Sequence, residues 1–160
     1  MLLRTCAAKV NGYSVARALL DTGSNKCFVK RDLARTCQAK VISRKGMTVT
    51  SFGGQKFESV FDVVMLSLQG VNTKAKLDVE AYVVDDPVGF FPRIPTVIVK
   101  EAVASGFEPV SDLCGCKSDS IGIILGEAVY DVIVKGPTCE FKKRSACHVD
   151  HFWVDVPWLC

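Results

Sequence analysis

"ALLDTGSNKCFV", residues 18–29, joins two apolar runs through a short polar stretch that begins with an acid. Residues 18–20 read as the end of a buried strand, and Asp21 follows directly, with Thr22 and Gly23 behind it. Glycine permits unusual backbone angles, and the N–H groups of a tight turn can hold a carboxylate in place. Holding an acid at the end of a buried strand costs free energy, and a function of the carboxylate would explain why the acid is there. We therefore interpret Asp21 as the candidate functional residue. A plain strand-ending turn, in which the acid bonds only its own backbone, is the alternative.

The strand before the acid is predicted to be half of a hairpin. Residues 4–10 alternate with a period of two, which is typical of a β-strand. Asn-Gly at 11–12 is a strong hairpin signal, so residues 14–20 are expected to return antiparallel and to carry Asp21 at their tip.

Two further segments predict strands. Residues 47–51 and 56–68 lie on either side of Gly53 and Gly54, which indicates a longer hairpin with a glycine turn. Residues 77–84 again alternate apolar and polar side chains. Several short strands joined by turns favour a small all-β barrel or sandwich.

Helices are expected to be few and short. Residues 31–37 and 126–133 each place apolar side chains on one helical face. Residues 85–95 contain three prolines and read as a loop, and residues 96–105 could hold another helical turn or two.

Composition limits the class of protein. With 160 residues and 49% hydrophobic content, the chain fits one folded domain with a short extension. The formal net charge of +3 comes without a long basic run, so we expect no direct nucleic-acid binding. No apolar run approaches the roughly 18 residues of a membrane span, and residues 1–10 lack the apolar core of a signal peptide. We therefore expect a soluble, cytoplasmic chain with no membrane partner.

The chain has eight cysteines at irregular spacings, and without an export signal reduced thiols are expected. In the tail, Cys139, Cys147, His148 and His151 lie within 13 residues of one another. Zinc sites need four converging ligands and usually use close Cys pairs, which this spacing does not match. We therefore predict no metal and no other cofactor. A zinc-stabilised nucleic-acid module is an alternative hypothesis for the protein, and it rests on these tail residues and the mild positive charge.

Three separated motifs together resemble a known family. "ALLDTGS" at 18–24 places an acid after an apolar strand, "VTSFGGQ" at 49–55 is a glycine-tipped hairpin, and "IGIILGEAVYDVI" at 121–133 leads an apolar strand through glycine into a helix. In combination they resemble the retropepsin-like aspartic proteases, and among these the proteases of BEL/Pao-type LTR retrotransposons. The resemblance implies a retropepsin-like closed β-barrel, the acid protease fold, with one lobe per chain. It predicts a protease domain at residues 1–136 and leaves 137–160 as a tail of unknown structure.

The resemblance also assigns roles to residues in each motif. Asp21 would be the catalytic acid, with Thr22 and Gly23 completing its turn. The substrate-binding flap tip would consist of Phe52, Gly53 and Gly54. The strand under the active-site loop would contribute Ile124, Leu125 and Gly126. Glu127 follows Gly126 directly, where the family more often has an intervening residue and then Asp, so the role of Glu127 stays open.

Aspartic proteases activate water between two carboxylates that share a proton, because like charges about 3 Å apart cannot both ionise. The chain contains a single Asp-Thr-Gly, so an enzyme of this type must be a symmetric homodimer in which the two copies of Asp21 meet. The resemblance suggests the element's own Gag-Pol polyprotein as the polypeptide substrate. The alternative is an inactive, domesticated relative that serves as a dimerisation or binding module, and the intact motif argues against it.

Overall fold

The computed structural model describes residues 4–50, 54, 56–71, 74–88, 97, 100, 104 and 120–134. Within these residues the strands are β1 (Arg4–Val10), β2 (Ser14–Leu20), β3 (Cys27–Lys30), β4 (Val41–Thr50), β5 (Lys56–Gly70), β6 (Lys76–Val84) and β7 (Ile123–Leu125). The helices with described bounds are α1 (Arg31–Thr36) and α3 (Glu127–Val134). The predominance of strands and the short helices confirm the predicted all-β class. The loop and helical turns predicted within 85–105 lie largely outside the described residues.

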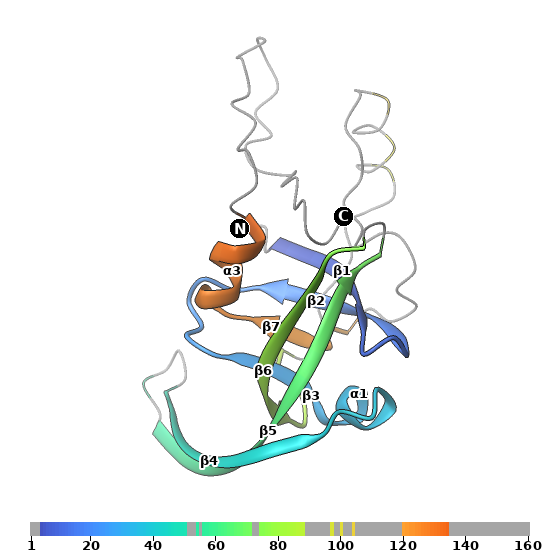
Figure 1. Cartoon of the computed structure of the whole chain (residues 1–160). Coiled ribbons are helices and arrows are strands. Elements are labelled where there is room, and N and C mark those ends of the chain that lie inside the picture. The colour runs from blue at the N-terminus through green and yellow to red at the C-terminus, as the bar shows by residue number, and fades with distance from the viewer. Residues whose placement is uncertain are drawn as a thin grey trace.

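Six of the described strands form a closed barrel. Each strand pairs with the next in the order β1, β2, β7, β3, β6, β5, and a further pairing of β1 with β5 closes the ring. β4 pairs only with β5 among the described strands, so it extends the sheet outside the ring (Figure 1). The predicted closed barrel is therefore confirmed.

The first predicted hairpin is present with the expected strand bounds. Val10 pairs with Ser14, so the turn has three residues, and Asn11 and Gly12 have φ angles of 48° and 78°. Positive φ at both positions is what Asn-Gly tolerates better than other pairs. The Asn11 side chain also joins distant segments, because Nδ2 donates to the Cys37 carbonyl at 3.0 Å and Oδ1 accepts from the Ser67 N–H at 2.8 Å.

Replacing Asn11 with Ala is expected to lower the free energy of unfolding by about 2 to 4 kcal/mol. The substitution removes both side-chain hydrogen bonds and leaves the left-handed conformation to alanine, which lacks the short polar side chain that lets Asn adopt it. Urea unfolding measures the loss. Asn11→Gly is the matched control, since it removes the same bonds but tolerates the backbone angle, and it should lose less. Equal stabilities of the Ala variant and the wild type would contradict the interpretation.

The second predicted hairpin is longer than the sequence indicated. β4 begins at Val41, six residues before the predicted start at residue 47, so that boundary was wrong. The early part of β4 contains consecutive polar residues and a register shift between Val41 and Ser43, which hide the period of two. Residues 44–50 of β4 and 56–62 of β5 pair with each other and with no other described strand. We call this two-stranded extension the β4–β5 arm (Figure 1).

The barrel interior is a single apolar cluster. Alternate residues of the strands point into it, including Ala18 and Leu20 of β2 and Leu125 of β7. Leu33 of α1 and Val129 of α3 pack against the same cluster. The strand that leads to Asp21 is therefore fixed by the core on one face.

Candidate active site

The loop that carries Asp21 crosses the end of a third strand. β7 lies between β2 and β3, parallel to β2 and antiparallel to β3. Residues 21–26 connect β2 to β3, so they must pass over the residues that follow β7. The loop that begins with Asp21 is thereby brought next to Gly126 in the motif at 121–133.

Three hydrogen bonds tie the loop to this crossing. The Asp21 N–H donates to the Leu125 carbonyl at 2.9 Å, and the Glu127 N–H donates to the Ser24 carbonyl at 2.8 Å. The Gly126 N–H donates to Cys27 Sγ at 3.4 Å. Backbone donors and acceptors of both segments are thus paired with each other, which holds the loop at a fixed height above β7.

Gly126 is required by the close approach of the two segments. A Cβ added at this position would lie 2.6 Å from the carbonyl oxygens of both Ser24 and Lys26. Contacts this short to backbone atoms cannot be relieved by moving a side chain. Glycine is therefore used here for space rather than for a left-handed backbone conformation.

The Asp21 carboxylate is held by its own turn. The Gly23 N–H donates to Asp21 Oδ1 at 2.9 Å, and the Ser24 N–H donates to the Asp21 carbonyl at 3.3 Å. The first bond is the one expected of a simple strand-ending turn, and it also fixes the orientation of the carboxylate. Within the described part of the chain, Oδ2 accepts no hydrogen bond. Asp21 is half-buried, whereas Thr22 and Gly23 are exposed.

Sequence reasoning missed the contribution of Cys27 and Ser24. Cys27 is buried beneath the loop, and this burial raises the pKa of its thiol above the ordinary value, so the sulfur that accepts from Gly126 is the neutral thiol at physiological pH. Ser24 Oγ donates to the Lys26 carbonyl at 2.7 Å and shapes the second half of the loop. The small polar residue after Asp-Thr-Gly was the available signal. Glu127 contributes its backbone N–H, while its side chain is exposed.

Neighbouring side chains of β7, the strand under the Asp21 loop, lie on opposite faces of the sheet. Leu125 belongs to the barrel core, but Ile124 does not and lies on the opposite face. Its direct neighbours across the sheet are Leu19 and Phe28. Leu19 and Ile124 are both apolar and buried, at 4% and 9% exposed, so this face of the sheet is covered at these positions.

Of the residues predicted to form the flap tip and the tail, the structure describes Gly54. Gly54 is exposed and has a φ of 76°, which suits a glycine turn. Phe52 and Gly53 lie outside the described residues, as does the whole tail at 137–160 with Cys139, Cys147, His148 and His151. In the part of the chain that the structure describes, no cluster of three or more His, Cys, Asp or Glu could hold a metal ion. The same residues contain no helix long and apolar enough to cross a membrane.

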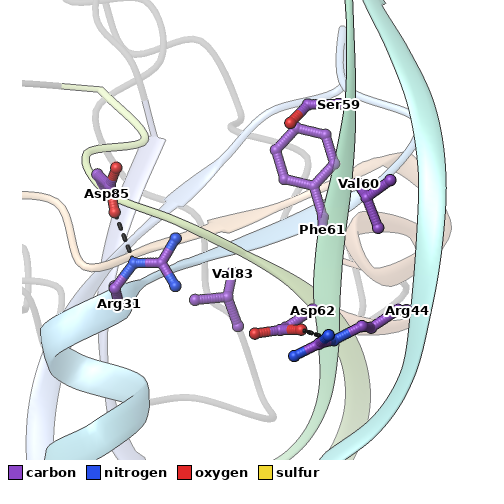
Figure 2. A pocket seen from close by; sticks show the side chains of 8 residues that line it. All are labelled: Arg31, Arg44, Ser59, Val60, Phe61, Asp62, Val83 and Asp85. Carbon is purple, nitrogen blue, oxygen red and sulfur yellow. Dashed lines mark hydrogen bonds and ion pairs between the residues drawn. The ribbon is translucent and has the colours of Figure 1, made fainter.

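A pocket of about 410 Å³ lies at the root of the β4–β5 arm (Figure 2). Asp21 does not line it, although the loop of Asp21 is where the sequence motifs converge. We assign the candidate chemistry to the Asp21 loop, because that loop combines an oriented carboxylate with a backbone built around it.

Comparisons with known proteins identify the family of the chain. A family model described as "Aspartyl protease" matches residues 6–126, a range that begins in β1 and ends at Gly126. No curated protein and no solved structure matches the chain. The matched range covers more than half of the chain. It contains the strands of the closed barrel, apart from the first two residues of β1, together with the Asp21 loop and Gly126. The chain therefore belongs to the aspartyl protease family.

Proposed function

We propose that the protein is an aspartic endopeptidase, active as a homodimer, in which water is activated between the Asp21 carboxylates of two subunits. The observation that carries the proposal is the fixed presentation of Asp21. One carboxylate oxygen is bound by the Gly23 N–H, and the loop is tied to β7 and α3 from below. A water-activating carboxylate needs such a preorganised setting.

The chemistry of the reaction supports the dimer. Two carboxylates that share one proton can act as base and acid in the same step, whereas a single carboxylate cannot fill both roles. The chain supplies one Asp-Thr-Gly, and retropepsin-like aspartic proteases generally act as dimers on polypeptide substrates. Thr22 and Gly23 are exposed beside Asp21, so a second copy can approach the loop along a two-fold axis.

Subunit mixing tests the shared site. Adding a threefold excess of Asp21→Asn chain to the wild type should reduce peptide cleavage per wild-type subunit to about one quarter, because only pairs with two intact Asp21 residues are active. The readout is the cleavage rate of a fluorogenic peptide after the subunits have exchanged. An equal excess of an unrelated protein is the control. An unchanged rate per wild-type subunit would refute the shared site.

We also propose the Gag-Pol polyprotein of a BEL/Pao-type LTR retrotransposon as the substrate, processed in the cytoplasm. The support is the motif set at residues 18–24, 49–55 and 121–133. The peptide is proposed to bind extended beneath the flap, adding a strand between the flap and the floor of the site. Incubation with the polyprotein followed by mass spectrometry of new N-termini should give a few discrete cleavage sites. Uniform degradation of the polyprotein would reject this substrate. So would an intact polyprotein after incubation with enzyme that cleaves short peptides.

A further inference from the structure

The pocket at the root of the β4–β5 arm joins two parts of the molecule. Its arm wall consists of Arg44, Ser59, Val60, Phe61 and Asp62. Its body wall consists of Arg31 at the start of α1, Val83 in β6 and Asp85 just beyond it. A ligand in the pocket would therefore contact the arm and the barrel at once.

Two arginines point into the pocket from its two walls (Figure 2). Arg31 Nε donates to Asp85 Oδ1 at 2.6 Å, and Arg44 Nε donates to Asp62 Oδ1 at 2.8 Å. In the described part of the chain neither arginine uses its terminal Nη groups in a hydrogen bond. Each guanidinium thus keeps a free pair of donors, and such a pair recognises a carboxylate in a planar, two-point geometry.

The two ion pairs in the pocket are exposed to solvent and weak. The Arg44 and Asp85 side chains are 74% and 86% exposed, and ion pairs of this kind contribute little to stability. The hydrogen bond from Arg31 lowers the pKa of the Asp85 carboxyl. The same hydrogen bond raises the pKa of Arg31, and the negative charge of Asp62 raises it further by a smaller amount. The four charges therefore form one electrostatic cluster across the boundary between arm and body.

Of the four other residues that line the pocket, Val60, Phe61 and Val83 are apolar and Ser59 is polar. Val60 is 69% exposed, and with Phe61 and Val83 it borders the charged cluster. A volume of about 410 Å³ is within the range of sites that bind small ligands or a few residues of a peptide. The pocket therefore offers two guanidinium groups, each paired through Nε with one carboxylate, beside three apolar residues.

We propose that this pocket is a second binding site, separate from the Asp21 loop, for a peptide that carries an acidic side chain next to a large apolar one. The carboxylate binds the Nη groups of Arg31 and Arg44, and the apolar side chain packs on Val60, Phe61 and Val83. Because the peptide contacts both walls, it holds the β4–β5 arm against the barrel. The proposal does not depend on Asp21 being catalytic.

Binding is tested with the full chain carrying Asp21→Asn, which keeps the probe peptides intact. The probes are acetyl-Val-Phe-Glu-Val-amide and its Gln counterpart, titrated by NMR. The Glu peptide should bind about tenfold more tightly than the Gln peptide, since hydrogen bonds to a charged acceptor are stronger than those to a neutral amide. The largest shifts should be at the amides of Val60, Phe61 and Val83. Equal affinities, or shifts confined to Gly23 and Ser24, would overturn the proposal.

Variants assign the preference to the two arginines. Combined Arg31→Gln and Arg44→Gln should abolish the preference for Glu over Gln, whereas Lys9→Gln, an exposed charge on β1 outside the pocket, should keep it. If the double variant does not fold, Arg44→Lys is used, which keeps the charge but loses the fork and should reduce the preference. Bound Glu peptide should also slow amide hydrogen exchange in residues 44–50 and 56–62. An unaltered preference in the folded arginine variants, or unchanged exchange on binding, would reject the site.

Discussion

Replacing Asp21 with Asn is expected to reduce peptide cleavage by about 1,000-fold or more, the scale of removing general acid–base catalysis. The amide has nearly the same shape as the carboxylate, so its oxygen can still accept the hydrogen bond from the Gly23 N–H. It cannot take a proton from water, however, and it cannot share one with the partner carboxylate. Cleavage of a mixed peptide library at about pH 4–6 measures the effect.

A matched substitution separates chemistry from folding in this experiment. Asp78 is an exposed acid on β6, and Asp78→Asn should leave the cleavage rate unchanged. Thermal unfolding of both variants should match that of the wild type within a few degrees. Cleavage that persists in the folded Asp21→Asn chain would remove Asp21 from the mechanism, and with it the proposed endopeptidase.

Replacing Gly126 with Ala is expected to lower the free energy of unfolding by about 2 to 4 kcal/mol and the cleavage rate by about 100-fold. The new methyl group would meet the carbonyl oxygens of Ser24 and Lys26 at 2.6 Å, so the active-site loop must shift away from β7. A displacement of about 1 Å is enough to misplace a catalytic group. Urea unfolding and peptide cleavage measure the two effects.

Gly46 provides the control for this substitution. It lies in β4, and an added Cβ there would have no atom within 4 Å. Gly46→Ala should therefore change stability by less than about 1 kcal/mol. If Gly126→Ala is as stable and as active as Gly46→Ala, the close approach of the loop to β7 is not essential.

Local pattern was sufficient to predict the strands that alternate cleanly. β1 and β6 follow the period of two, and Asn-Gly at 11–12 marked the turn after which β2 returns. The start of β4 was not predictable in this way, because residues 41–46 have no regular alternation and become a strand by pairing with β5. Pairing supplies the hydrogen bonds that the local sequence does not select.

The roles of neighbouring apolar residues could not be separated by sequence either. Ala18, Leu20 and Ile124 all read as apolar residues close to the acid. The structure places Ala18 and Leu20 in the barrel core and Ile124 on the opposite face. Alternation shows that two faces exist, but only the sheet order shows which strands share each face.

The sequence alone determined the acid, the glycine-supported turn behind it and the all-β class, since these depend on residue type and on spacing within a few positions. Tertiary structure decided that β7 runs between β2 and β3, that Gly126 lies directly beneath the Asp21 loop, and that Arg31 and Arg44 face one pocket. These features join residues far apart in the chain. They depend on which strands become neighbours when the barrel closes, and no local period encodes that choice.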